Sequence, residues 1–269
     1  MGRTTRIALC AVVGAGTALG VTGVAGAASW SAVQKVPNDS SSATSPNGST
    51  NLVANLAANG KASIVFRARG NRFWVSRRSS NTANFGKPTE AFPAIRPITN
   101  RFDVGMDENT RLSMAMGQST GTNDALTGIA GAIQTSKGWG KATRLSPNNG
   151  LTYGNPTVVS NPKGDVYAAF AGQSAGAAAV YVRRGSTSSG AYGGTSTLKG
   201  LSGSSHVSPP NIDMGITNSG TLYVAFELDD GSIASYRRAS SGGWTQLPTI
   251  AQEVNGNTPD GWDLDVPSS

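Results

Sequence analysis

Short runs that alternate between polar and apolar residues follow one another along most of the chain. Examples are residues 30–36 and 139–145, which run into loops marked by proline or glycine. Alternation with a period of two predicts a strand with one buried face, and turns rich in Gly, Ser and Asn separate these runs. The pattern therefore predicts a chain built from short β-strands.

Large aromatic residues recur at the head of such runs, usually after a Gly/Ser/Asn-rich turn. Successive intervals are 55, 54, 53 and 52 residues, which indicates an internal repeat of about 53 residues. The aromatic residues that mark the repeat are Trp30, Phe85, Trp139, Tyr192 and Trp244.

Three more strand-like runs lie between successive aromatic markers. The first set comprises 51–54, 102–105, 156–159, 211–214 and 261–264. The second and most apolar set comprises 62–66, 112–115, 166–170 and 222–226. The third set comprises 73–78, 180–184 and 234–238, each ending in two arginines, and 130–134, which lacks them. Turns between the first and second sets contain Asn59-Gly60, Asn109-Thr110, Lys163-Gly164 and Ser219-Gly220.

Four short strands in a repeat near 53 residues are typical of a β-propeller blade, whereas solenoid repeats of this size are helical. A β-sandwich has similarly spaced strands but does not require regular aromatic markers. We predict an all-β, β-propeller-like fold with four complete four-stranded blades, in which stacking buries the second and third strands. The predicted repeats span approximately 51–92, 101–146, 155–199 and 210–248.

Two lone strands remain at the ends of the pattern, at 30–36 and 261–266. We expect them to pair into a partial fifth blade that closes the ring, because open outer strands invite pairing with other chains. The alternative is that the chain belongs to a longer ring.

The N-terminal residues carry the pattern of a secretory signal peptide. Arg3 and Arg6 precede an apolar, Gly/Ala-rich run over 7–24, and Ala25-Gly26-Ala27 is an A-x-A cleavage signature. A membrane anchor is the alternative, but glycines dilute the run and it ends in small residues. We predict a signal peptide over 1–27, a single domain over 28–269, and a secreted, extracellular protein that is not held in the membrane after cleavage.

The amino-acid composition excludes several classes of protein and of binding site. The 269 residues include 35 Gly, and 14% are charged, which fits neither a helical bundle nor a charged disordered tail. A single His and a single Cys exclude a His/Cys zinc site and a disulfide framework, and oxygen-rich turns such as 107–109 do not form a complete calcium loop. We therefore predict no metal and no cofactor. A modest positive charge spread by the repeat predicts no nucleic-acid partner.

The arginine-pair segments carry a family resemblance. Residues 74–78 with 84–88, and 235–238 with 242–244, resemble blades of the bacterial sialidase/BNR-like propeller superfamily, and most of all secreted actinobacterial repeat proteins of unassigned role. The family's Asp-box is absent as such, since its counterpart at 240–245 keeps Ser, Gly and Trp without the Asp. The arginine triad, Tyr/Glu pair and Asp acid of sialidases do not map onto this chain. The resemblance therefore implies a fold more than an activity.

Catalytic patterns are weak. Gly-x-Ser-x-Gly occurs at 117–121 and 172–176, but both copies follow the second strand of a repeat, and His206 is the single available base. Glycoside hydrolysis needs a pair of carboxylates. Asp103 and Asp213 share one register with Asp263, which favours a structural role, and Glu227 follows a second strand.

The paired arginines are the most distinctive charge feature. Side chains alternate across a strand, so the two members of each pair face opposite neighbouring blades, and their guanidinium groups can meet carboxylates or carbonyls. The functional alternative is an acidic partner such as a sialylated or uronic-acid glycan. Trp139 and Trp244 are candidates for stacking on sugar rings.

These observations favour a secreted, non-catalytic β-propeller that binds an extracellular carbohydrate or cell-surface polymer. The alternatives are a sialidase-like glycoside hydrolase, truncated or degenerate, and a structural or protein–protein interaction module. The candidate ligand-binding residues are Asp103, Asp213, Glu227, Arg77, Arg183, Arg237, Trp139 and Trp244.

Overall fold

The computed structural model describes residues 52–57, 59–68, 72–91, 98–119, 126–154, 156–174, 177–198, 211–228 and 232–250. All described residues belong to one compact unit of the chain, which lies within 35–269. The predicted signal peptide, the lone strands at 30–36 and 261–266, Asp263 and His206 lie outside the described residues. Within the described residues, no helix has the length and apolar character needed to cross a membrane.

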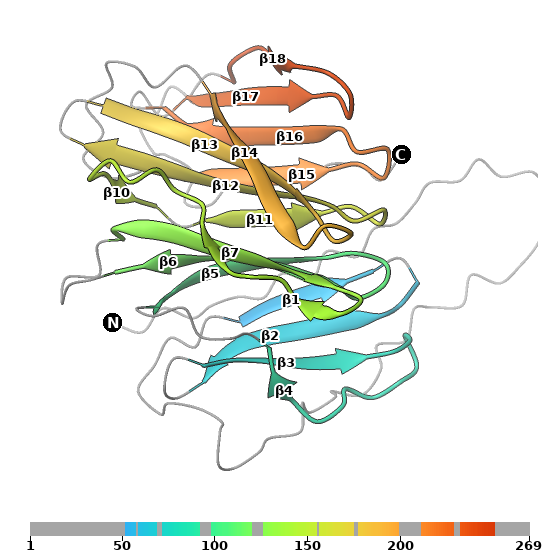
Figure 1. The fold of residues 1–269 in the computed structure, drawn as a ribbon. Helices are drawn as coiled ribbons and strands as arrows, with labels where there is room; N and C mark the ends of the chain where they lie inside the picture. The colour runs from blue at the N-terminus through green and yellow to red at the C-terminus, as the bar shows by residue number, and fades with distance from the viewer. Residues whose placement is uncertain are drawn as a thin grey trace, which may run out of the picture. The chain divides into compact units, whose positions relative to one another are not determined.

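The described residues form four antiparallel sheets whose main strands follow each other in chain order (Figure 1). The first sheet contains β1 (Leu52–Leu56), β2 (Ala62–Ala68), β3 (Arg72–Arg78) and β4 (Thr89–Glu90). The second contains β5 (Ile98–Met106), β6 (Leu112–Gln118), β7 (Gly128–Thr135), β8 (Gly138–Trp139) and β9 (Thr143–Arg144).

The third sheet contains β10 (Thr152–Tyr153), β11 (Thr157–Ser160), β12 (Asp165–Ser174), β13 (Ala177–Ser186) and β14 (Ala191–Leu198). The fourth contains β15 (Ile212–Ile216), β16 (Leu222–Glu227), β17 (Ile233–Arg238) and β18 (Trp244–Gln246). The middle two sheets have a fifth strand because one edge strand of each is broken into two short strands. In the third sheet β10 and β11 both pair with β12, and in the second sheet β8 and β9 both pair with β7.

Each of the four predicted complete repeats therefore corresponds to one antiparallel meander. The weakest part of the prediction is the fourth strand. Trp139, Tyr192 and Trp244 lie in such strands, but Phe85 lies in the loop before the two-residue β4.

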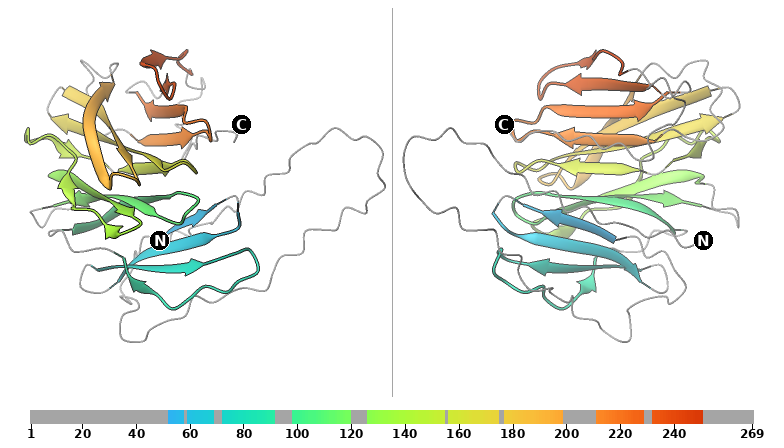
Figure 2. Two further views of the ribbon diagram at one scale, coloured as in Figure 1. Left: turned by 45° about the vertical axis from the view of Figure 1, so that its right-hand side comes forward. Right: turned by 180° about the vertical axis from the view of Figure 1, so that it is seen from behind.

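Neighbouring sheets pack face to face through three apolar clusters, and the first strands of consecutive sheets lie beside one another (Figure 2). Phe73 and Phe102 join the first and second sheets, with their rings 4.7 Å apart in an edge-on arrangement. The predicted burial of second and third strands is confirmed most clearly by β6 and β7, which are buried along most of their length. This stacking of meanders is propeller-like.

A polar side chain closes the hairpin between the first and second strands in three of the sheets. In each case a side-chain oxygen accepts the backbone N–H of the residue four positions later, at 2.9–3.0 Å. The pairs are Asp107 with Arg111, Asn161 with Asp165, and Thr217 with Thr221. In the first sheet Ala57 occupies this position, and Asn59 accepts the N–H of Lys61 instead.

The same four hairpins place one residue in the left-handed backbone region. Gly60, Gly164 and Gly220 have φ of 79°, 89° and 91°, whereas the second sheet has Thr110 at φ 63°. A β-branched side chain in this region is strained, because its Cβ crowds the backbone.

We expect Thr110→Gly to raise the free energy of unfolding by about 0.5–1 kcal/mol, because relief of the strain exceeds the entropy cost of glycine. The reciprocal change, Gly164→Thr, should lower it by about 2 kcal/mol or more, since a Cβ there would also collide with Thr187. Urea unfolding measures both changes. A stability loss in Thr110→Gly would contradict the account of this turn.

Candidate ligand-binding site

The register of the third strands decides which arginine faces which neighbouring sheet. In the first and fourth sheets, Arg77 lies opposite Ser63 and Arg237 opposite Tyr223. In the third sheet the residue opposite Tyr167 is Arg184, not Arg183. The arginine pair of the third sheet is therefore shifted by one residue, and the predicted trio Arg77, Arg183 and Arg237 does not occupy equivalent positions.

A shift of one residue exchanges the two faces of a strand. Arg77 reaches the following sheet, where its Nη2 donates to Gln134 Oε1 at 3.1 Å. Arg183 reaches toward the preceding sheet, where its Nε donates to the carbonyl of Leu145 at 2.9 Å. Its Nη1 donates to the carbonyl of Gly193, on β14 of its own sheet, at 2.7 Å. Burial lowers the pKa of both arginines. Arg183 therefore fulfils the structural expectation of guanidinium–carbonyl bonding.

The residues at the ends of the third strands can be compared at the three junctions between neighbouring sheets. Between the first and second sheets, Arg77 and Gln134 close the junction with their hydrogen bond. Between the second and third, Ile133 lies so close to Gly185 that a Cβ on the glycine would collide with it. Between the third and fourth, the residues are Arg184 and Arg238, and both line a cavity of about 310 Å³.

Arg238 is held in this cavity by two aromatic rings. Its Nη1 donates to the hydroxyl of Tyr167 at 3.2 Å. Its guanidinium carbon lies 5.9 Å from the ring centre of Tyr167 and 6.0 Å from that of Trp244. Among the described residues, no carboxylate lies within ion-pair distance of Arg238. Its charge is therefore stabilised by π-faces and one hydroxyl.

Arg184, across the cavity, pairs with its own sheet. Its Nη2 lies 3.0 Å from Asp165 Oδ1, and this hydrogen bond raises the pKa of Arg184. Ser196, which lies opposite Val182 on the same face, adds a hydroxyl group to the wall. The indole N–H of Trp244, another wall residue, is buried without an acceptor among the described residues. The site thus offers two guanidinium groups, hydroxyls and an aromatic surface, which suit an anionic, oxygen-rich ligand.

Asp103 is placed differently, as a link between the second and third sheets. Its Oδ1 accepts the N–H of Val104 at 2.8 Å. Its Oδ2 accepts the N–H of Val158 at 2.6 Å and the hydroxyl of Thr157 at 3.3 Å. Burial raises the pKa of Asp103, and the backbone hydrogen bonds act in the opposite direction. Both oxygens are engaged, so the geometry favours a structural role.

The remaining candidates are dispersed. Asp213 Oδ1 accepts the N–H of Met214 at 2.7 Å, and Glu227 Oε2 accepts from the side-chain amide of Asn211 at 3.3 Å. Trp139 packs against the apolar cluster between the first and second sheets, and Arg237 is exposed on β17. Of the eight candidate residues, Trp244 lines the cavity between the third and fourth sheets.

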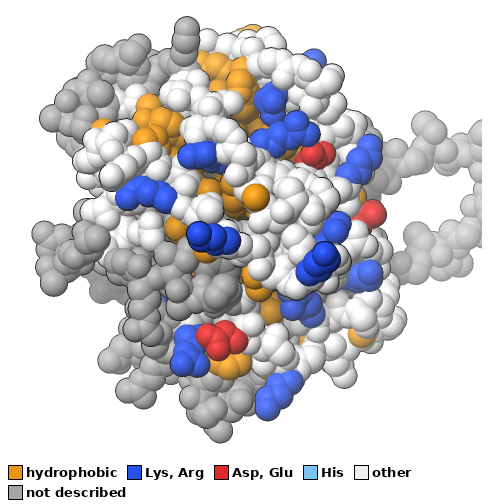
Figure 3. Space-filling view, in the orientation of Figure 1, with side chains coloured by type: hydrophobic (Ala, Val, Ile, Leu, Met, Phe, Trp, Pro, Cys, Tyr) orange, Lys and Arg blue, Asp and Glu red, His pale blue; other side chains and the backbone are white. Residues whose placement is uncertain are grey.

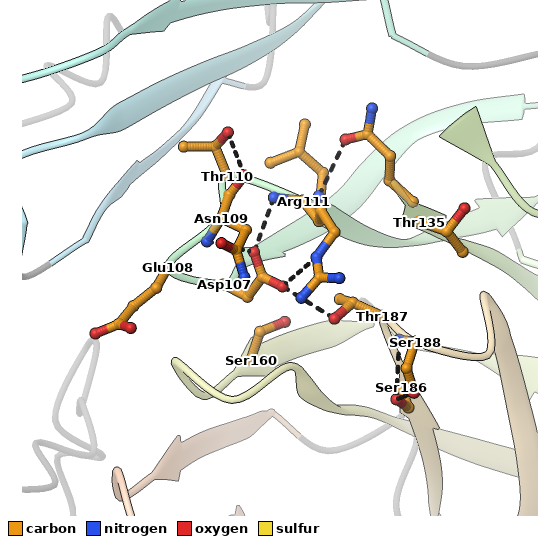
Figure 4. A network of polar contacts seen from close by, with 12 residues as sticks. Asp107, Glu108, Asn109, Thr110, Arg111, Thr135, Ser160, Ser186, Thr187 and Ser188 are labelled. Atoms are coloured by element: carbon orange, nitrogen blue, oxygen red, sulfur yellow. Dashed lines mark hydrogen bonds and ion pairs between the residues drawn. The ribbon is translucent and has the colours of Figure 1, made fainter. Parts of the chain in front are cut away.

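Asp107, in the turn considered for calcium, belongs to a buried network that also joins two sheets (Figure 4). Its Oδ1 accepts the N–H groups of Asn109 and Arg111, each at 2.9 Å. Its Oδ2 accepts from Arg111 Nε at 2.7 Å and from the Thr187 hydroxyl, on the β13–β14 hairpin, at 2.9 Å. These bonds occupy the carboxylate. Among the described residues, no group of three His, Cys, Asp or Glu side chains could hold a metal ion.

Charge alone does not locate the site. On the face shown in Figure 3, Lys and Arg side chains are spread among neutral groups. The described parts of the two Gly-x-Ser-x-Gly segments lie at the ends of β6 and β12, in an all-strand setting that lacks the helix of a nucleophile elbow.

Sequence reasoning missed Tyr167, Arg184 and Arg238. The arginine pairs are a signal, but the sequence predicts their first members as ligand-binding residues. Only the register shows that the second members, Arg184 and Arg238, line one cavity.

No protein-family model matches the chain, and no curated protein matches it either. Among solved structures, a protein of unknown function from Dyadobacter fermentans has a TM-score of 0.50 at 13% identity, with 80% of this chain and 68% of that chain covered. This likeness bears on the fold alone.

Two further similar structures have TM-scores below 0.5. One is an ulvan lyase of polysaccharide lyase family PL25 bound to -[GlcA(1-4)Rha3S]-, with a TM-score of 0.48, 11% identity, and 74% of this chain covered. The other is the BP39L lectin from Burkholderia pseudomallei, with a TM-score of 0.47, 14% identity, and 75% covered. The chain spans little more than half of either protein, 55% and 56% respectively.

We expect Asp103→Asn to lower the free energy of unfolding by about 1–3 kcal/mol, because the amide NH₂ must face at least one backbone N–H donor. Thr157→Val removes only the 3.3 Å hydrogen bond from the Thr157 hydroxyl to Asp103, so it should lower the free energy of unfolding by less. Thermal and urea unfolding compare the two variants. Unchanged stability in Asp103→Asn would show that the carboxylate does not join the sheets.

Proposed function

We propose that the protein binds an acidic carbohydrate in the cavity between its third and fourth sheets and does not catalyse a reaction on it. The observation that carries the proposal is that Arg184 and Arg238 line one cavity. At the equivalent positions of the other two junctions, side chains close the space between the sheets. Arg184 shares its charge with Asp165, whereas Arg238 has no carboxylate partner among the described residues, so the two guanidinium groups leave a net positive charge that attracts an anion.

The chemistry of the wall favours a sugar acid over a simple anion. Guanidinium groups bind carboxylates through paired hydrogen bonds. Ser196 can exchange hydrogen bonds with sugar hydroxyls, and Trp244 presents an amphipathic aromatic surface. A volume of about 310 Å³ lies at the lower end of the range for small-molecule sites, which suits one sugar unit. A uronic acid combines these features.

The residues that line the cavity support a non-catalytic role. Glycoside hydrolysis uses two carboxyl groups on opposite sides of the scissile bond. None of the described residues that line this cavity is Asp or Glu. The resemblance of the arginine-pair segments to sialidase/BNR-like propellers supports the fold in this proposal, and a sialidase-like hydrolase remains the alternative that an activity assay addresses.

The proposal extends to the setting of the protein. A secreted protein meets acidic polysaccharides and surface polymers outside the cell, and the signal-peptide pattern over 1–27 supports export. Pairing of 30–36 with 261–266 as a partial fifth blade would complete a propeller and cover open strand edges.

Export predicts a defined mature N-terminus. Mass spectrometry of the protein secreted by a bacterial host should find cleavage after Ala27 or Ala28, because small residues at this point fit signal peptidase. Retention of the intact chain in the cells would contradict secretion.

Binding is tested with Arg238→Gln, which recreates the Arg–Gln pairing of the first junction and should therefore leave the fold intact. Loss of a charge-assisted hydrogen bond predicts a dissociation constant for methyl glucuronide about 10–100-fold higher, measured by calorimetry. The matched control is Arg78→Gln, the equivalent position of the first sheet, where the guanidinium lies over Phe85. It should bind like the unaltered protein.

The ligand's carboxylate is tested with methyl glucoside, which should bind at least about 10-fold more weakly than methyl glucuronide. Equal affinity for the two sugars, or an unchanged affinity in Arg238→Gln, would contradict the proposal. Turnover of a fluorogenic sialoside would support the hydrolase alternative.

A further inference from the structure

A second hollow adjoins the proposed sugar site. It has a volume of about 490 Å³, and its lining includes residues 191–194 of β14. β14 is the last strand of the third sheet (Figure 1). Arg184 and Gly194 line both hollows, so the two share a wall. The outer one is also lined by Asp165, Tyr192 and Gly193.

We infer that these hollows form one extended groove that binds consecutive units of an acidic polysaccharide, with one unit at Arg184 and Arg238 and the next along β14. This inference rests on the proposed function. It goes beyond that function by assigning a second subsite and a polymeric ligand.

The backbone of β14 forms a bulge opposite Arg184. Arg183 pairs with Thr195 and Gly185 pairs with Tyr192, so the single residue Arg184 lies opposite both Gly193 and Gly194. Such a bulge redirects the neighbouring side chain. Arg184 consequently stands at the boundary between the two hollows, where its guanidinium group can serve either sugar unit.

The glycines of the bulge are not required by the fold. Neither has a φ in the left-handed region, in contrast to Gly190 at 69°. A Cβ on Gly194 would meet nothing within 4 Å, and one on Gly193 would meet only the carbonyl of Arg184 at 3.5 Å, an ordinary contact. Glycine weakens a strand and often marks a place where another molecule approaches the backbone. Here it keeps the floor of the groove free of side chains.

The groove also differs in polarity from the inner cavity. In the outer hollow, Arg184 is paired with Asp165, and 48% of its side chain is exposed. The carboxylate and guanidinium can accept from and donate to sugar hydroxyls. The inner subsite therefore selects for the acid, and the outer subsite suits the neutral face of a following unit.

The test compares methyl glucuronide with a tetrasaccharide of linked glucuronic acid, using calorimetry on the full chain. The unaltered protein should bind the tetrasaccharide at least about 10-fold more tightly, because it fills both subsites. Gly193→Val places a side chain in the outer hollow alone. It should remove that preference and leave the affinity for methyl glucuronide unchanged.

The matched control is Gly86→Val in the first sheet, where a Cβ would likewise meet only the carbonyl of an arginine, Arg77, at 3.6 Å. It should retain the preference for the tetrasaccharide. Thermal unfolding of both variants should show no loss of stability.

The outcomes separate the two proposals. If the unaltered protein binds neither sugar, both the proposed function and the groove are wrong. If it binds both sugars equally, only the extended groove is wrong. A Gly193→Val variant that keeps the tetrasaccharide preference, or that unfolds at a clearly lower temperature, would also overturn the groove.

Discussion

Face-to-face packing between neighbouring sheets is the constraint on which the rest of this structure depends. A four-stranded meander has two faces and can bury each of them only against another sheet. The apolar clusters bury most of that surface, but the ends of the third strands carry polar residues that need hydrogen-bond partners or space between the sheets. Each junction therefore needs its own solution where a third strand of one sheet meets the next sheet.

The solutions differ, and the difference creates a site. At the first junction an arginine and a glutamine satisfy each other, and at the second an isoleucine fills the space left by a glycine. At the third, Arg238 lies against the rings of Tyr167 and Trp244, and Arg184 lines the same cavity while turning to Asp165. A repeated structural position has thus become a cationic cavity through a few residues, while Asp103 and Asp107 hold the preceding junction together.

Sequence reasoning reached the strands but not the site. Alternation and the turn residues, for example Lys163-Gly164 between β11 and β12, located the main strands of all four sheets, because these signals are local. The face of each arginine is not local. It depends on how β13 pairs with β12, and a shift of one residue moves Arg184 to the position that Arg77 holds in the first sheet. The cavity further requires Arg238, which comes from the next repeat.

The most direct test of this account is a crystal structure of the protein with a glucuronic-acid oligosaccharide. The account predicts a sugar carboxylate between the guanidinium groups of Arg184 and Arg238, with the sugar ring beside Trp244. A sugar bound elsewhere, with this cavity filled only by water, would contradict it.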